Sequence, residues 1–284
     1  MTAASPPRVP VLMYHEIADA TATSSPLAVA PDVFADQMAY LHDAGFNTLT
    51  AGELAAFLAD GVGQLPERPV VLTFDDGYGD FYTDALPLMK QRGYTGTLFQ
   101  TTGWVGKEGE TKRMLNWREL AELNEAGVEI GAHTVRHPQL DQLPEKELRD
   151  ELYISKSVLE DKLGFAVPGL AYPFGYSNRK VREIAREFGY TYAYAVDNAL
   201  TTSAAQNFTF PRLTVRRTTT MDQFRRMVNG KDTLALRQAR ILTKGFSVVR
   251  RTRSRRTQST SRSGGRSAAG ISRRWRAAML ARPS

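Results

Sequence analysis

The alternation of short apolar runs with amphipathic segments is the feature that most constrains the fold of this chain. Up to about residue 230, runs rich in aliphatic and aromatic residues are each followed by a stretch whose apolar residues recur every three or four positions. This alternation predicts repeated β–α units that form a mostly parallel sheet with right-handed crossovers. Seven or eight such units in about 220 residues predict a barrel, in which functional groups lie at the carboxyl ends of the strands.

The same pattern predicts where the elements begin and end. The expected strands are Val9–Tyr14, Phe46–Leu49, Val70–Phe74, Gly96–Thr101, Val128–Ala132, Gly169–Tyr172, Thr191–Val196 and Leu213–Val215. The expected helices are Pro31–Ala44, Ala51–Asp60, Phe81–Gln91, Trp117–Ala126, Glu145–Leu163 and Lys180–Phe188. Glycine follows five of these helices, as expected of C-terminal caps: Gly45, Gly93, Gly127, Gly164 and Gly189.

Charge divides the chain into two segments. Residues 231–284 contain fifteen Lys or Arg and one acid, Asp232, whereas residues 1–230 contain the other 22 basic and 29 acidic residues. We therefore expect a mildly acidic globular domain over 1–230 and a basic, largely disordered tail over 231–284. Three interpretations of the tail stay open: a solvated appendage, a segment that binds an anionic membrane surface, and a segment that binds nucleic acid or another polyanion.

Two absences narrow the class of protein. Cysteine is absent, which excludes disulfides, thiolate nucleophiles and thiolate metal ligands. No apolar run approaches the ~20 residues that a membrane-spanning helix needs, and the first residues lack the features of a secretory signal. These observations lead us to expect a cytoplasmic protein, with the tail as a peripheral attachment to a membrane.

Two acidic residues stand together at the end of a predicted strand. Asp75 and Asp76 follow the apolar run VVLTF, and Gly77 after them permits a tight turn or the close approach of a ligand. Two adjacent carboxylates oppose each other's ionisation, and a bound cation would remove that conflict.

Two of the four histidines also follow a predicted strand. His133 and His137 lie in GAHTVRHP, four residues apart, so they share one side if the segment makes a helical turn. One carboxylate and two imidazoles form a common open ligand set for a catalytic divalent metal. One aspartate would then bind the metal, and the other would remain as an anionic base.

Three motifs carry a family resemblance. TFDDG at 73–77, HTVRHP at 133–138 and YPFG at 172–175 resemble, in order and spacing, the motifs of the polysaccharide deacetylases, the NodB-homology or carbohydrate esterase family 4 enzymes. The resemblance covers roughly residues 8–228. It implies a distorted (β/α) barrel of about seven strands, and hydrolysis of N-acetyl or, less often, O-acetyl groups on sugars.

The resemblance also implies residue roles. Asp76, His133 and His137 would hold a divalent metal, most readily Zn²⁺, although Ni²⁺, Co²⁺ and Fe²⁺ accept the same ligands. Asp75 would be the general base. Near YPFG, three residues would line the acetyl pocket, where a backbone N–H could hold the oxyanion: Phe174, Gly175 and Tyr176.

The chain departs from the family pattern at three places. No histidine follows His137, so the late motif that supplies the general acid is replaced by FPRLTV at 210–215. Ala171 stands where many members have an arginine, and the late Asp-x-x-Asp-Trp signal is missing. VPVLMYHEI at 9–17 resembles the opening of the poly-N-acetylglucosamine deacetylase branch, a permuted form of the family in which His15 would supply the acid. We group Arg212 with the substrate-binding residues and expect it to steady Asp75.

These features together predict a metal-dependent hydrolase that removes N-acetyl groups from an N-acetylated sugar or polysaccharide, with no obligate protein partner. One alternative is a catalytically silent sugar-binding or scaffold protein that acts through its basic tail. A second alternative, a dehalogenase-like phosphatase, requires an Asp-x-Asp spacing, whereas TFDDG has adjacent acids.

Overall fold

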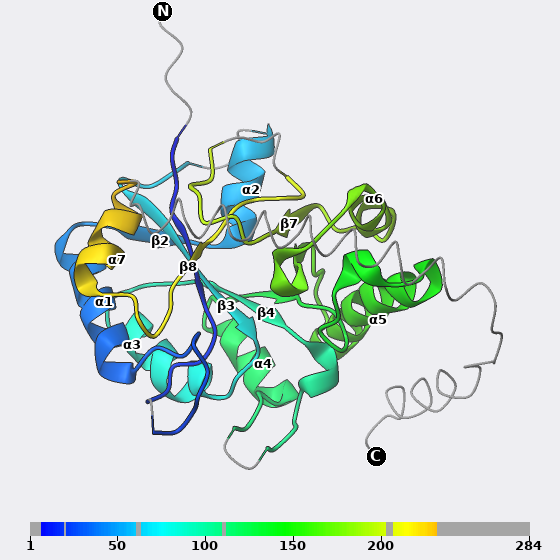
Figure 1. Ribbon diagram of the computed structural model, residues 1–284, viewed down its shortest axis with the longest axis horizontal. Coiled ribbons are helices and arrows are strands. Elements are labelled where there is room, and N and C mark those ends of the chain that lie inside the picture. The colour runs from blue at the N-terminus through cyan, green and yellow to red at the C-terminus, as the bar shows by residue number, and fades with distance from the viewer. Residues whose placement is uncertain (1–6, 20, 61–63, 110–111, 203–206, 232–284) are drawn as a thin grey trace, which may run out of the picture. The chain divides into compact units, whose positions relative to one another are not determined.

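The computed structural model describes residues 7–19, 21–60, 64–109, 112–202 and 207–231 (Figure 1). The predicted tail lies outside the described residues, except for Lys231. In the part of the chain that is described, no helix is both long enough and apolar enough to cross a bilayer.

A curled parallel sheet forms the centre of the domain, and helices surround it (Figure 1). Its order is β7-β6-β5-β4-β3-β1-β8, with β2 paired to β3 beside this path. All of these strand pairs are parallel. The strands are β1 (Val11–Tyr14), β2 (Asn47–Leu49), β3 (Pro69–Asp76), β4 (Thr97–Gln100), β5 (Glu129–Ala132), β6 (Gly169–Ala171), β7 (Tyr192–Tyr194) and β8 (Leu213–Thr214). The predicted distorted (β/α) barrel is confirmed in the form of a half-barrel.

The helices connect successive strands. The α-helices are α1 (Pro31–Asp43), α2 (Ala51–Asp60), α3 (Leu86–Lys90), α4 (Trp117–Glu125), α5 (Glu145–Leu163), α6 (Arg179–Glu187) and α7 (Met221–Val228). Short turns of other helix types are the π-helical η1 (Phe81–Ala85) and the 3₁₀ helices η2 (Thr102–Trp104), η3 (Leu140–Gln142) and η4 (Pro173–Gly175). Caps fix several bounds: Asn116 and Thr220 each form a capping box at the start of α4 and α7.

Strand alternation divides the core into two clusters. On β3, Val70, Leu72 and Phe74 belong to the larger cluster beneath the outer helices. Val71 belongs to the smaller cluster, which also contains Phe99 and residues of α2 such as Leu54. Because side chains alternate along a strand, every second residue of β3 reaches the interior of the barrel. This alternation brings polar side chains near the end of β3 into a protected space.

Several predicted bounds were wrong by one or two residues. In addition, one predicted helix is divided into two elements, and one helix was not predicted. The expected helix Phe81–Gln91 is divided into the π-helical η1 and the α-helix α3, with Pro87 in the first turn of α3. Pro87 has no N–H for the ladder of a continuous helix, which explains the break. The helix α7 was missed, although Thr220 and Gln223 form a recognisable capping-box pair.

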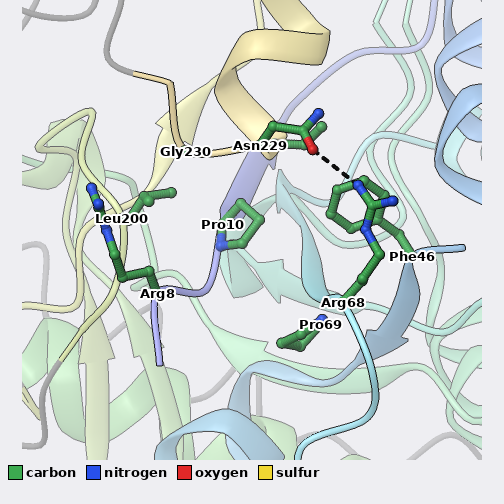
Figure 2. Close-up of a pocket in the computed structure, with 9 residues that line it drawn as sticks. Arg8, Pro10, Phe46, Arg68, Pro69, Leu200, Asn229 and Gly230 are labelled. Atoms are coloured by element: carbon green, nitrogen blue, oxygen red, sulfur yellow. Dashed lines mark hydrogen bonds between the residues drawn. The ribbon is translucent and has the colours of Figure 1, made fainter. Parts of the chain in front are cut away.

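A pocket lies at the amino end of the barrel (Figure 2). Its lining includes the arginines Arg8 and Arg68 and the prolines Pro10 and Pro69. Pro10 and Pro69 precede or begin β1 and β3, so the pocket lies at the opposite ends of these strands from Asp75 and Asp76. The Arg68 guanidinium lies 4.3 Å from the centre of the Phe46 ring and donates to Asn229 Oδ1 at 2.9 Å. It also donates to the Ala44 carbonyl at the end of α1.

Candidate metal centre

The two adjacent carboxylates are the last residues of β3, not the first residues after it as the sequence pattern predicted. The strand continues because Asp75 pairs with Phe99, and Asp76 with Gln100, of β4. In regular alternation their side chains would point to opposite faces. Asp76 has a φ of 75°, in the left-handed region, and this departure allows both carboxylates to lie beside His133.

Asp75 is held by a buried arginine. The Arg212 guanidinium donates to Asp75 Oδ1 at 2.6 Å and to Oδ2 at 2.8 Å. It also donates to Thr73 Oγ1 and to the Ala195 carbonyl, both at 3.2 Å. Burial alone would raise the pKa of Asp75, but the charges and hydrogen bonds of Arg212, with His133 and His15, lower it to about 2. Asp75 is therefore an anion at neutral pH.

The burial of Arg212 bears on its predicted role. Arg212 is 0% exposed, so it lies beneath Asp75 and does not line a surface that a sugar can reach. Its expected contact with Asp75 is present, and its complete burial gives no support to its grouping with the substrate-binding residues.

His133 and His137 converge without the helical turn that their spacing suggested. Residues 133–138 form a loop after β5, with φ values of 67° at Thr134 and 59° at His137. His133 Nδ1 lies 2.8 Å from the Ala171 carbonyl on β6. A carbonyl only accepts, so Nδ1 carries the proton and Nε2 keeps a free lone pair. The residue that replaces the family's arginine therefore orients the first imidazole through its backbone.

Three potential ligand atoms meet at the end of β3. The Nε2 atoms of His133 and His137 lie 3.6 Å and 3.4 Å from Asp76 Oδ1. One ligand atom from each of the three residues lies within 4.8 Å of the other two. Asp76 Oδ1 is buried and has no hydrogen-bond partner among the described residues. An orphaned carboxylate oxygen facing two imidazole nitrogens fits a divalent metal, which prefers such N and O ligands.

The electrostatics of Asp76, His133 and His137 favour a bound cation. Burial, reinforced by the charge of Asp75, raises the pKa of Asp76 to about 8. Burial also lowers the pKa of His133 to about 4 and that of His137 to about 3, so both rings are neutral at pH 7. Neutral imidazoles are the form that binds metals. A cation would supply the positive charge that allows Asp76 to ionise beside Asp75.

His15 directly follows β1 and faces the same cluster. Its charge interacts with those of Asp75, Arg212 and His137, and its Nδ1 is buried without a partner among the described residues. Burial lowers the pKa of His15 to about 4. The structure therefore brings His15 to the carboxyl end of the barrel, where the sequence placed it, in the neutral form.

Aromatic rings flank His137 on two sides. The Phe174 ring lies 4.7 Å from the His137 ring, and the Trp104 ring lies 5.5 Å from it. Phe174 is 51% exposed, has a φ of 59°, and stacks on Tyr176 at 6.3 Å. Gly175 has no room for a side chain, because a Cβ there would lie 2.4 Å from the Val196 backbone nitrogen. Of the three residues predicted for the acetyl pocket, Phe174 thus contacts His137, and Tyr176 packs on Phe174.

Sequence reasoning missed other polar residues near the cluster. Tyr78 lies close to the Asp76 side chain, and its pKa is raised by burial and by the Asp76 charge. Glu16 is buried and pairs with Lys112 at 2.7 Å, and the Lys112 ammonium lies 5.4 Å from the Tyr78 ring centre. Glu16 lies inside the motif VPVLMYHEI and Tyr78 directly follows TFDDG, so proximity in sequence was the available signal.

Glu151 was also missed. It lies at a core-facing position of α5, together with Leu148, Leu152 and Leu159. Its carboxylate accepts hydrogen bonds from the loop that carries the two histidines. A carboxylate on the apolar face of a predicted helix was the available signal, because such a group needs buried partners.

Comparisons with known proteins agree with this site. The model of the family described as polysaccharide deacetylase matches residues 62–193, which include Asp75, Asp76, His133 and His137. The protein YxkH of Bacillus subtilis (strain 168) is 32% identical over 185 residues. That match covers 65% of this chain and 63% of YxkH, so the chain spans slightly less than two thirds of this relative. A poly-beta-1,6-N-acetyl-D-glucosamine N-deacetylase of Staphylococcus aureus (strain N315) is 26% identical over 200 residues, which cover 66% of this chain and 68% of the relative.

Solved structures show the same fold. The Streptococcus pyogenes deacetylase PplD, in complex with acetate, has a TM-score of 0.72 and 26% identity, and the match covers 81% of this chain and 100% of PplD. IcaB from Ammonifex degensii has a TM-score of 0.66 and 26% identity, over 81% of this chain and 99% of IcaB. The motifs, the half-barrel and these matches show that the chain belongs to the polysaccharide deacetylase family, carbohydrate esterase family 4 with the NodB-homology fold.

Proposed function

We propose that this protein is a metal-dependent deacetylase that removes N-acetyl groups from an N-acetylated saccharide. One observation carries the proposal: a cluster of Asp76, His133 and His137 lies directly beside Asp75, whose charge is fixed by Arg212. This combination places a possible cation site next to a permanently ionised base. A solvated pair of acids would show neither the burial nor the bidentate guanidinium.

Asp76, His133 and His137 would hold the divalent metal. When bound, the metal would act as a Lewis acid toward the acetamide carbonyl and lower the pKa of a water molecule. The Ala171 carbonyl prepares this site, because it fixes the tautomer of His133. Zn²⁺ is our proposal for the metal, since it readily accepts this ligand set.

Asp75 would accept a proton from the attacking water. Its bidentate contact with Arg212 keeps it ionised and limits its rotation, and His133 Nε2 lies 3.9 Å from its Oδ2. His15, which burial keeps neutral at rest, would take up a proton as negative charge develops in the reaction and deliver it to the nitrogen of the leaving amine, which is a poor leaving group without one. The protons balance over one turnover: water gives one proton to Asp75, the amine nitrogen receives one through His15, and the proton left on Asp75 replaces the one that His15 took up. The products are acetic acid, which ionises to acetate, and the amino sugar.

The aromatic residues beside His137 would bind the acyl group and the sugar. Phe174 and Tyr176 form a stacked pair next to His137, and Phe174 is half exposed. Apolar rings of this kind suit a methyl group or the face of a sugar ring. A backbone N–H of η4 would stabilise the oxyanion.

The names of the relatives support a proposal for the substrate class. The Staphylococcus aureus relative is named for a polymer of N-acetyl-D-glucosamine, and we propose an N-acetylated polysaccharide for this chain. We also propose that residues 231–284, with fifteen Lys or Arg, attach the protein peripherally to an anionic membrane in the cytoplasm.

Acetate release from N-acetylglucosamine oligomers tests the function. Wild type should release acetate when Zn²⁺ is supplied and stop when a chelator removes it. Asp75→Ala should lose activity by a factor of roughly 10²–10⁴, the usual contribution of a general base, while it still binds Zn²⁺. His42→Ala is the matched control, because His42 lies on α1 with an exposed side chain.

Two outcomes would contradict the proposal. Full activity of Asp75→Ala would mean that another group is the base. A folded, zinc-loaded wild type that releases no acetate from any oligomer would favour a sugar-binding role, and the tail would be tested next.

A further inference from the structure

The loop that carries His133 and His137 has an unfavourable backbone conformation that other residues must stabilise. It lies between β5 and η3, outside any helix or strand, and Thr134 and His137 both have positive φ values. Such backbone conformations cost a non-glycine residue free energy, and they persist only where surrounding contacts impose them. Within the loop, the His137 N–H donates to Thr134 Oγ1 at 3.0 Å, and contacts from outside the loop add to this bond in setting the positions of the two imidazoles.

Backbone carbonyls of the loop are bound from one side by the segment after β4. The Thr102 N–H donates to the Thr134 carbonyl at 3.0 Å, and the Gly103 N–H donates to the Val135 carbonyl at 2.8 Å. Gly103 permits this approach, because a Cβ there would lie 2.4 Å from the Val135 oxygen. These contacts use two acceptors of the loop, and the N–H groups of Val135 and Arg136 bind another partner.

Glu151 accepts hydrogen bonds from backbone N–H groups of the loop. Its Oε2 accepts the backbone N–H of Val135 at 2.8 Å and that of Arg136 at 3.0 Å, while its Oε1 accepts Arg136 Nε at 2.6 Å. The residue is 1% exposed, on the core-facing side of α5. Burying a carboxylate is costly unless it is fully hydrogen-bonded, and here its bonds go to the residues between the two histidines.

We propose that Glu151 is a positioning residue for the metal centre: its carboxylate fixes the backbone of Val135 and Arg136, and thereby the separation and orientation of the His133 and His137 rings. The inference rests on the proposed role of these histidines as metal ligands. Glu151 itself touches neither the cluster nor a substrate, so its effect is on metal affinity through the loop. A residue that merely packs α5 would affect stability and leave metal affinity unchanged.

Glu151→Gln tests the proposal with almost no change in volume. An amide has one acceptor oxygen and one donor nitrogen, so it cannot satisfy both the backbone N–H groups and Arg136 Nε. We expect the Zn²⁺ dissociation constant, measured by competition with a chelator, to rise about 10- to 100-fold, as for other groups that orient metal ligands. In the metal-free protein, amide hydrogen exchange at residues 135 and 136 should accelerate. Glu151→Asp, which keeps the charge on a shorter side chain, should give an intermediate affinity.

Ser155→Ala is the matched control. Ser155 is a buried polar residue one turn further along α5, and its hydroxyl contacts the Leu152 carbonyl and Tyr190, not the loop. This variant should lower the thermal midpoint without changing the Zn²⁺ dissociation constant more than twofold.

Three results separate the inference from the proposed function. An unchanged Zn²⁺ affinity in Glu151→Gln, or an equal loss of affinity in Ser155→Ala, would overturn the positioning role. Zinc binding by wild type without acetate release would contradict the proposed function and leave the affinity comparison valid. If wild type binds no Zn²⁺, the metal role fails, and unchanged amide exchange in Glu151→Gln would overturn the positioning of the loop as well.

Discussion

The two ends of the barrel each depend on an arginine, and the two arginines work under opposite conditions. At the carboxyl end, Arg212 is buried and pairs with the buried Asp75. At the amino end, Arg68 is exposed, covers the Phe46 ring and binds Asn229 (Figure 2). It also donates to the Ala44 carbonyl. Removing Arg212 would leave the charge of Asp75 buried without a partner, whereas removing Arg68 would let water reach the groups that it contacts. Stability at the carboxyl end therefore depends on the pairing of these charges far more than it does at the amino end.

Arg212→Leu should produce the largest loss. It leaves Asp75 buried without its counter-charge, which typically costs about 3–5 kcal/mol of unfolding free energy. Urea denaturation of the metal-free protein measures this loss. Acetate release should fall as well, because the pKa of Asp75 then rises toward the value that burial favours. A loss below about 1 kcal/mol, the range of exposed ion pairs, would remove the contrast between the two ends.

A pair of glycine substitutions compares the two ends at the level of the backbone. Gly77 follows β3 at φ 91°, and a Cβ there would lie 2.0 Å from Gln100 Oε1. Gln100 cannot easily move, because its Nε2 donates to the Asp76 and Thr101 carbonyls. Gly93 precedes β4 at φ 66° and has open space around it. Gly93→Ala should cost about 1 kcal/mol from backbone strain alone, and Gly77→Ala about 1–3 kcal/mol more from overpacking.

Thermal unfolding of the two metal-free variants measures this difference. Zinc affinity should fall in Gly77→Ala and stay constant in Gly93→Ala, since only Gly77 adjoins Asp76. Equal midpoints for the two variants would show that the carboxyl end tolerates crowding as well as the amino end does.

Asp80→Asn should reveal a pH dependence that belongs to the carboxyl end. Burial raises the pKa of Asp80 to about 7, against the backbone hydrogen bond from Ile17. Between the ordinary aspartate pKa and pH 7, the folded state holds a proton that the unfolded state has lost, so stability falls as pH rises. The variant cannot lose this proton and should show a shallower decline between about pH 4 and pH 7. Parallel curves for the two metal-free proteins would contradict the shift.

Arg68→Ala should produce the smallest effect. Its hydrogen bonds and ring contact are exposed, so we expect a loss of about 1 kcal/mol in unfolding free energy. Acetate release and zinc affinity should match those of wild type, because the pocket lies at the opposite ends of β1 and β3 from the metal centre. A large loss of activity would show that the two ends are coupled.

The sequence predicted the parts of the site that follow strand ends. Asp75, Asp76, His133 and His15 each end or follow a buried strand, and parallel strands present their carboxyl ends on one side. Strand length was underestimated because acidic residues rarely continue a strand. The β4 ladder overrides that preference at Asp75 and Asp76.

Other parts of the site depend on contacts between distant segments. Arg212 could be placed near Asp75, but its complete burial has no sequence signature. The convergence of His133 and His137 was predicted for the wrong reason, since positive φ values at Thr134 and His137, imposed by η2 and Glu151, replace the expected helical turn. Local pattern does not contain these long-range hydrogen bonds.

The pairing of Asp75 with Arg212 also bears on the order in which the molecule is made. The two residues are 137 positions apart, and β8 is the last strand of the sheet to leave the ribosome. During synthesis, Asp75 is therefore translated long before its counter-charge exists, and its neighbours on β3 and β4 can pair while it remains hydrated. Docking of β8 against β1 would then complete the charged interior as a late, non-local step. A chain interrupted before residue 212 has every proposed metal ligand and lacks the group that settles the charge beside them.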